Sequence, residues 1–107
     1  MLIVTPPVHP GEILREDFLG PLELSAGKLA KALNVPRTRI ERLASEKTAL
    51  TADTAFRLGK YFGTSPEFWM NIRSSYDMSC LHADKKRLAA LEAIVPLERP
   101  DLEGEVA

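Results

Sequence analysis

The residues best suited to chemistry lie in one short segment near the middle of the chain, residues 36–45. This segment, PRTRIERLAS, is predicted to form a helix that Pro36 opens, and at about 100° per residue Pro36, Ile40 and Leu43 share the side toward the core. The other side carries hydroxyl, carboxylate and guanidinium groups, on Thr38, Glu41, Arg42 and Ser45, with Arg37 and Arg39 flanking them. Guanidinium groups pair with guanine, carboxylates accept from cytosine, and threonine contacts the thymine methyl group. The helix therefore has the side chains needed to read base edges in DNA.

The charges of the chain are distributed unevenly, although its net charge of −1 does not by itself indicate a nucleic-acid-binding protein. Residues 1–23 carry a net charge of −3, residues 24–48 carry +4, and residues 49–107 carry −2. A basic block between acidic flanks is typical of a local anion-binding surface. Because such a block can also be ordinary solvated surface, it supports DNA binding only together with the spacing of the helices.

A helix-turn-helix is predicted over residues 25–45, because two helical segments are separated by a turn of only three residues, 34–36. Ser25 is a favourable N-cap for the first of these helices. Ala30 supplies the small side chain needed where the two backbones approach, and Asn34 tolerates the left-handed conformation of a tight helix exit. Three apolar side chains are expected to hold the second helix against the first: Val35, Ile40 and Leu43. An ordinary helical hairpin with a solvated basic face is the alternative.

Four further helices are expected, and no segment shows the alternation of a strand. Their boundaries follow from proline, glycine and capping residues: a first helix from Pro10 to Leu19 before Gly20-Pro21, a fourth from its N-cap Thr51 to Gly63, a fifth from a Thr64–Glu67 capping box to Tyr76-Asp77, and a last one from about His82 to Ile94. The apolar side of the fourth helix is expected to include Tyr61, and Trp69 of the fifth is expected in the core or a dimer seam.

These elements predict an all-α chain with a compact five-helix domain and a C-terminal helical extension. Residues 1–8 are expected to form an extended N-terminal arm, residues 9–78 the DNA-binding domain, and residues 79–107 a C-terminal helix and acidic tail. The segment Lys85-Lys86-Arg87 is interpreted as a solvated helix face.

Several classes of function are excluded by what the sequence lacks. It has no Gly-rich phosphate loop, nucleophile elbow or acid–base pair, so we expect neither an enzyme nor a cofactor. His9 and His82 have no neighbours at metal-ligand spacing, so we expect no metal site, and His9 is expected to pack or cap at the start of the first helix. The single Cys80 excludes an intrachain disulfide. Without a signal peptide or membrane-spanning run, the chain is expected to be cytoplasmic.

Three motifs in order resemble the HigA/VapI branch of antitoxins, within the lambda-repressor-like (XRE) helix-turn-helix family. They are His9 to Leu14 (HPGEIL), Leu24 to Lys47, and a closing part from Thr51-Ala52-Asp53-Thr54-Ala55 through Phe62 to Trp69 and on to Tyr76-Asp77. Together they cover about residues 8–78. The sequence departs from the family at Ala26 and Gly27, where glutamine is common, and at Asn34 and Glu46, where glycine is usual.

The resemblance implies a homodimer that binds a palindromic operator of double-stranded DNA in its own promoter. It also implies a toxin partner, a RelE-like enzyme that cleaves mRNA and is neutralised by the antitoxin. By position, it assigns base reading to Arg37, Thr38, Glu41 and Arg42, and phosphate contacts to Lys47 and Thr48. Two alternatives remain: a stand-alone XRE-type repressor without a toxin, and a protein-interaction module that has lost DNA binding.

Overall fold

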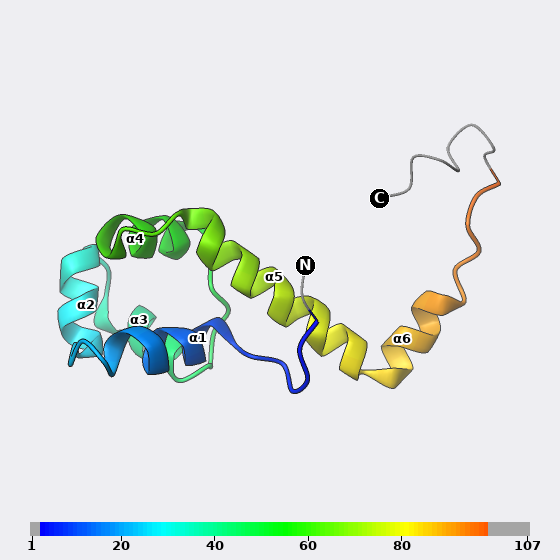
Figure 1. The fold of residues 1–107 in the computed structure, drawn as a ribbon, viewed down its shortest axis with the longest axis horizontal. Helices are drawn as coiled ribbons and strands as arrows, with labels where there is room; N and C mark the ends of the chain where they lie inside the picture. Colours follow the sequence, from blue (N-terminus) through cyan, green and yellow to red (C-terminus); the bar gives the residue numbers. More distant parts are fainter. Residues whose placement is uncertain (1–2, 99–107) are drawn as a thin grey trace.

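The computed structural model describes residues 3–98, and all regular elements in that part of the chain are helical (Figure 1). In chain order they are α1 (Pro10–Ile13), the π-helical segment η1 (Leu14–Leu19), α2 (Ala26–Leu33), α3 (Arg37–Ala44), α4 (Ala52–Phe62), α5 (Pro66–Ala83) and α6 (Lys85–Glu92). The predicted all-α fold is therefore confirmed. Pro100 and the acidic tail at 101–107 lie outside the described residues.

The first predicted helix has the expected extent but two different windings. It starts as α-helix at Pro10, where the side chain of His9 caps it: Nδ1 accepts a hydrogen bond from the Gly11 N–H at 2.8 Å. From Leu14 onward the helix is π-helical, and the N–H of Gly20 donates to the carbonyl of Arg15, five residues earlier, at 3.0 Å. The prediction that His9 caps this helix is confirmed, whereas a single α-helix to residue 19 was wrong.

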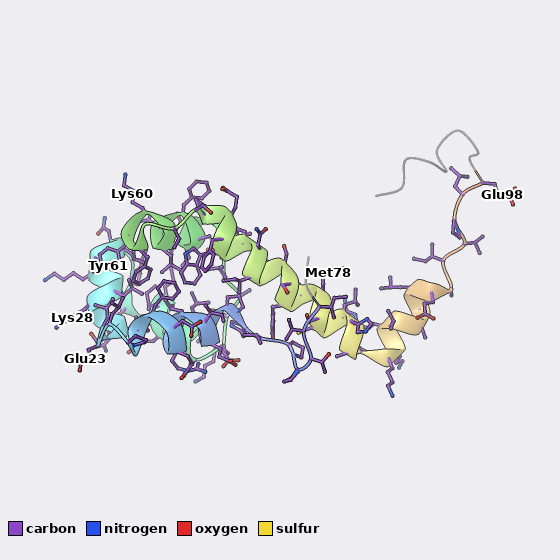
Figure 2. All side chains as sticks on the ribbon, in the orientation of Figure 1. Glu23, Lys28, Lys60, Tyr61, Met78 and Glu98 are labelled. Atoms are coloured by element: carbon purple, nitrogen blue, oxygen red, sulfur yellow. The ribbon has the colours of Figure 1, made fainter. Side chains whose placement is uncertain are left out.

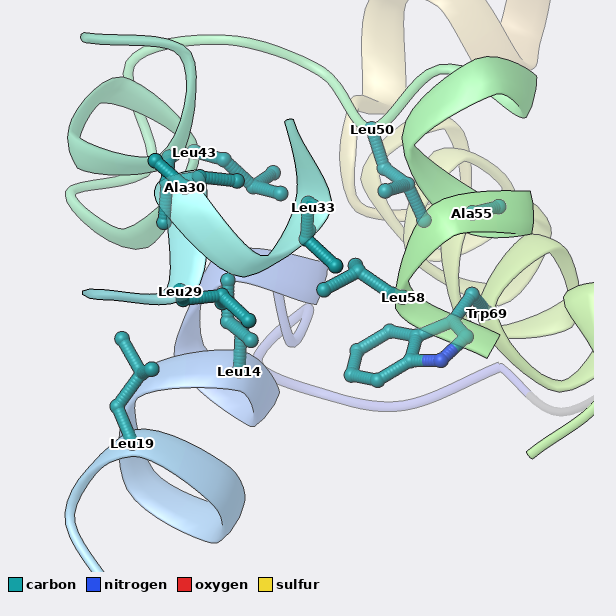
Figure 3. Close-up of a cluster of buried hydrophobic side chains, with 11 residues drawn as sticks. Leu14, Leu19, Leu29, Ala30, Leu33, Leu43, Leu50, Ala55, Leu58 and Trp69 are labelled. Atoms are coloured by element: carbon teal, nitrogen blue, oxygen red, sulfur yellow. The ribbon is translucent and has the colours of Figure 1, made fainter. Parts of the chain in front are cut away.

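The core is a cluster of apolar side chains from all of the first five helices (Figure 3). Trp69 is fully buried, and its Nε1 donates to the Thr64 hydroxyl at 2.9 Å, so its one polar atom is satisfied. Phe18 and Phe62 lie beside its indole. The other fully or nearly fully buried apolar side chains are Leu14, Leu29, Ala30, Leu33, Ile40, Leu43, Leu50, Ala55 and Leu58. Core packing of Trp69 is thus confirmed, but Tyr61 was wrongly expected inside and is 48% exposed.

The joint between α4 and α5 was predicted correctly on one side and wrongly on the other. Gly63 ends α4 with a φ of 75°, in the left-handed region that glycine tolerates. The expected capping box is absent, because the hydroxyl of Thr64 accepts from the Trp69 indole instead. Ser65 is the N-cap of α5, and its Oγ accepts a hydrogen bond from the Phe68 N–H at 3.1 Å.

Helix α5 continues well past Tyr76-Asp77, where it was expected to end. Contacts with the N-terminal arm hold this second half: the Tyr76 ring packs edge-on against His9 at a centroid distance of 4.9 Å, and the Val4 N–H donates to Ser79 Oγ at 2.8 Å. A hydrogen bond with Cys80 and burial raise the pKa of Tyr76. The break falls at Asp84, whose carboxylate caps α6. The last helix therefore begins at Lys85, not at His82.

Candidate nucleic-acid interface

The helix-turn-helix is formed by α2, a three-residue turn and α3, as predicted. Ser25 caps α2 by accepting a hydrogen bond from the Lys28 N–H at 3.1 Å. Asn34 has φ 59° and ψ 48°, the left-handed conformation expected of it, and the Val35 N–H returns to the Ala30 carbonyl at 3.0 Å. Pro36 differs from the prediction: it is the exposed N-cap of α3 and does not reach the core.

One face of α3 is buried and the other is open. Ile40 and Leu43 are buried in the core, so they fix which side of the helix turns outward. Five of the predicted contact residues lie exposed on α3: Arg37, Thr38, Arg39, Glu41 and Arg42. The last two follow in the loop after α3, with Lys47 exposed and Thr48 half-buried. Thr48 lines the same surface hollow, of about 420 Å³, as Arg39 and Arg42.

Arg37 lies across the start of α2 because residue 27 has no side chain. A Cβ placed on Gly27 would be 3.2 Å from the Cδ atom of Arg37, closer than an ordinary van der Waals contact. The Arg37 guanidinium also forms an exposed ion pair with Glu41, one helical turn further on, at 3.4 Å between Nε and Oε2. The departure from the family at Gly27 therefore leaves space that the aliphatic part of Arg37 uses.

Arg39 is engaged within the protein. Its Nη1 lies 2.6 Å from Oδ2 of Asp53, and Nε of Arg57 lies 2.9 Å from the same oxygen. Arg57 also donates from Nη1 to the carbonyl of Leu33 at 2.9 Å. Hydrogen bonds from Arg57 and Arg39 hold the pKa of Asp53 below its usual value. This cluster links the end of α2, α3 and the start of α4.

Sequence reasoning placed Asp53 only in a helical first turn and gave Arg57 no role. The spacing of four residues between these two opposite charges was the available signal, since such pairs face each other on a helix. Nothing local indicated that Arg39, from another helix, joins them.

Arg42 and Lys47 carry the unpaired positive charges of this surface. Among residues 3–98, neither side chain forms an ion pair. The Lys47 N–H donates to the Arg42 carbonyl at 2.8 Å, which keeps the start of the loop close to the end of α3. Both cations are therefore available to an external anion.

Glu46 places a carboxylate beside this surface, but Arg15 of the first helical segment pairs with it. The Nη2–Oε2 distance is 3.1 Å, and Arg15 also donates to the carbonyl of Ala44 at the end of α3. Hydrogen bonds with Glu16 and then Glu46 raise the pKa of Arg15. Glu46 has a φ of 63°, which explains why glycine is usual at this position in the family that the sequence resembles.

The described residues contain no group of three His, Cys, Asp or Glu side chains placed to hold a metal ion. No helix in the same part of the chain is long and apolar enough to cross a membrane.

Comparison with known proteins agrees with this geometry. A family model described as "Helix-turn-helix" matches residues 14–69. The chain is 41% identical to a solved structure described as Pseudomonas aeruginosa antitoxin HigA with the higBA promoter, with a TM-score of 0.75, covering 85% of this chain and 98% of that one. The chain belongs to the HigA branch of the XRE-type helix-turn-helix family. This is a family of DNA-binding regulators and antitoxins, not of enzymes.

Two further relatives of this HigA-type chain cover most of its length. Virulence-associated protein I of Dichelobacter nodosus is 46% identical over 92 residues, which are 86% of this chain and 82% of that protein. An HTH-type transcriptional regulator of Haemophilus influenzae is 36% identical over 96 residues, which are 89% of this chain and 90% of that protein. The resemblance inferred from the three sequence motifs is confirmed.

Proposed function

We propose that the chain is a sequence-specific DNA-binding antitoxin that represses its own operon as a homodimer and neutralises a RelE-like, mRNA-cleaving toxin. The observation that carries the DNA-binding part is the outer face of α3, where hydroxyl, carboxylate and guanidinium groups are exposed on a helix fixed by Ile40 and Leu43. A relative of the same fold is described in a structure with its promoter, which supports the same use of this helix.

In the proposed complex α3 lies in the major groove. Arg37, Thr38, Glu41 and Arg42 contact base edges, while Lys47 and Thr48 contact the phosphate backbone. Arg39 lies at the side of this face, and its ion pair with Asp53 gives it the role of orienting α3 against α4 as well. Because phosphate contacts release counterions, affinity falls steeply with salt concentration.

Two copies of the chain place their α3 helices in successive major grooves, about 34 Å apart, on a palindromic operator. A repressor of its own promoter acts where that DNA is, in the cytoplasm. The toxin-binding part of the proposal is supported by the relatives named antitoxins.

A second candidate, a stand-alone XRE-type repressor without a toxin, is favoured by the relative from Haemophilus influenzae, which is named only as a transcriptional regulator. One experiment separates the two: the tagged chain is purified from its native cells, co-purifying proteins are identified, and bound DNA is sequenced. A small basic partner, encoded next to this chain and recovered with its promoter DNA, supports the antitoxin. The partner must also cleave mRNA in a purified assay and stop doing so when this chain is added.

Promoter DNA without a partner supports the stand-alone repressor. A partner without DNA means that the helix-turn-helix is only a scaffold, which contradicts the proposed repression.

A further inference from the structure

Helix α6 is the part of the described chain with the least contact to the rest. It packs against the end of α5 and lies far from α1–α4 (Figure 1). None of its residues is buried. Large apolar side chains are nevertheless exposed on it and directly after it: Leu91 (43%), Ile94 (66%), Val95 (86%) and Leu97 (76%). Such a run of exposed apolar residues indicates a surface that is covered by a partner.

The apolar side chains of α6 form one stripe with charges along its edge. Leu88 and Leu91 are three residues apart and share a face of the helix. Lys85 and Glu92 lie on the same edge of that stripe, on either end of it, at about 60° and 40° from Leu88 on the helical wheel. Lys86 lies on the opposite side of the helix.

Lys85 and Glu92 are too far apart to pair with each other. Seven residues of α-helix separate them by about 10 Å along the axis. Among the described residues neither side chain forms an ion pair. The same edge of one helix therefore ends in opposite charges, both unpaired.

This pattern is complementary to itself when the direction of the helix is reversed. A two-fold axis perpendicular to two antiparallel helices brings one edge of the first against the same edge of the second and exchanges the ends. Lys85 of one copy then lies near Glu92 of the other, and the reverse pair forms by symmetry. Leu88 of one copy lies opposite Leu91 of the other, which buries the stripe.

We propose that residues 84–98 form a docking surface for a second copy of this chain, with the two α6 helices antiparallel. The exposed residues after α6 extend the apolar surface toward the second copy's end of α5, where Met78 is 44% exposed (Figure 2). This inference rests on the proposed function, because it names the surface that joins the two copies of the repressor. A two-fold axis between the α6 helices matches the two-fold symmetry of a palindromic operator.

Charge reversal in the full-length chain tests this docking surface. Self-association is measured without DNA, by analytical ultracentrifugation over a range of concentrations. Lys85→Glu and Glu92→Lys each replace two symmetric attractive pairs with two repulsive ones, so each is expected to weaken dimerisation roughly tenfold. The double variant, Lys85→Glu with Glu92→Lys, restores opposite charges and is expected to recover the wild-type dissociation constant within a few-fold. Circular dichroism confirms that each variant is folded.

Lys86→Glu is the matched control, because it makes the same charge change on the opposite side of α6 and is expected to leave dimerisation unchanged. The proposal is overturned if wild-type protein is monomeric throughout, if neither single reversal weakens the dimer, or if the double variant does not recover. Binding of each variant to a single operator half-site is measured alongside. Loss of half-site binding in every protein, wild type included, contradicts the proposed function and leaves the result on self-association standing.

Discussion

Gly11 in the first helix lies against the carbonyl oxygen of Leu43 near the end of α3, so closely that a Cβ on residue 11 would be 1.8 Å from that oxygen. Only glycine permits this approach, since no real Cβ comes so near. His9 caps the same helical turn, and Arg15 of the next turn donates to Ala44. The first helix therefore supports the C-terminal end of the helix that is proposed to enter the major groove.

Gly11→Ala is expected to destabilise the protein by about 3 kcal/mol, because the obstacle is backbone and either helix must move to accommodate the methyl group. The free energy of unfolding is measured by urea denaturation. Gly20→Ala is the control: its Cβ would meet the Arg15 carbonyl oxygen at 3.4 Å, and its φ of −61° suits alanine. We expect that change to stay within about 0.5 kcal/mol of wild type. Equal stability of the two variants would refute the close contact.

Asp53 is expected to make stability depend on pH in the acid range. Its two arginine partners lower its pKa in the folded protein, so the ionised carboxylate adds stability above the unfolded-state pKa of about 3.8. That stability is lost as the pH falls through the folded-state pKa. Between about pH 4 and about pH 2, wild type should therefore lose more stability than Asp53→Asn, which is already less stable at neutral pH.

Urea midpoints at a series of pH values measure this difference. Asp17→Asn is the control, because Asp17 is exposed and forms no ion pair with another described residue, and it should follow the wild-type curve. An Asp53→Asn curve parallel to wild type would show that the cluster of Arg39, Asp53 and Arg57 adds nothing to stability.

Lys47→Ala is expected to weaken DNA binding by a similar factor on operator and scrambled duplexes, because a phosphate contact carries no sequence information. The slope of log affinity against log salt should become shallower by about 1. Titrations at four salt concentrations measure both effects, with Lys86→Ala on α6 as a control that leaves the slope unchanged. A loss confined to the operator duplex would instead assign Lys47 to base reading.

The sequence predicted the helix-turn-helix almost to the residue, because its determinants are local. Ser25, Asn34 and the spacing of Ile40 and Leu43 act over a few residues, and the structure shows each in the expected role. The errors concern choices made at longer range. The extent of α5 depends on contacts of Tyr76 and Ser79 with the N-terminal arm, some seventy residues earlier in the chain.

The same reasoning applies at the proposed interface. The exposed residues of α3 were predictable from the helical wheel, since burial of one face determines the other. The pairing of Arg39 with Asp53 and of Glu46 with Arg15 was not, because each pair joins different helices and depends on how those helices pack. Local rules therefore located the surface but did not show which of its charges are already paired.

The most direct test of the central claim, that the outer face of α3 reads base edges in DNA, is the affinity of Arg42→Ala for the chain's own promoter. Fluorescence anisotropy compares wild type and variant on the operator duplex and on a set of duplexes with single base-pair changes. The account predicts a loss of about 1–3 kcal/mol on the operator and a relaxed preference at one base-pair position in each half-site, with unchanged protein stability. Equal affinity of wild type and Arg42→Ala on every duplex would contradict it.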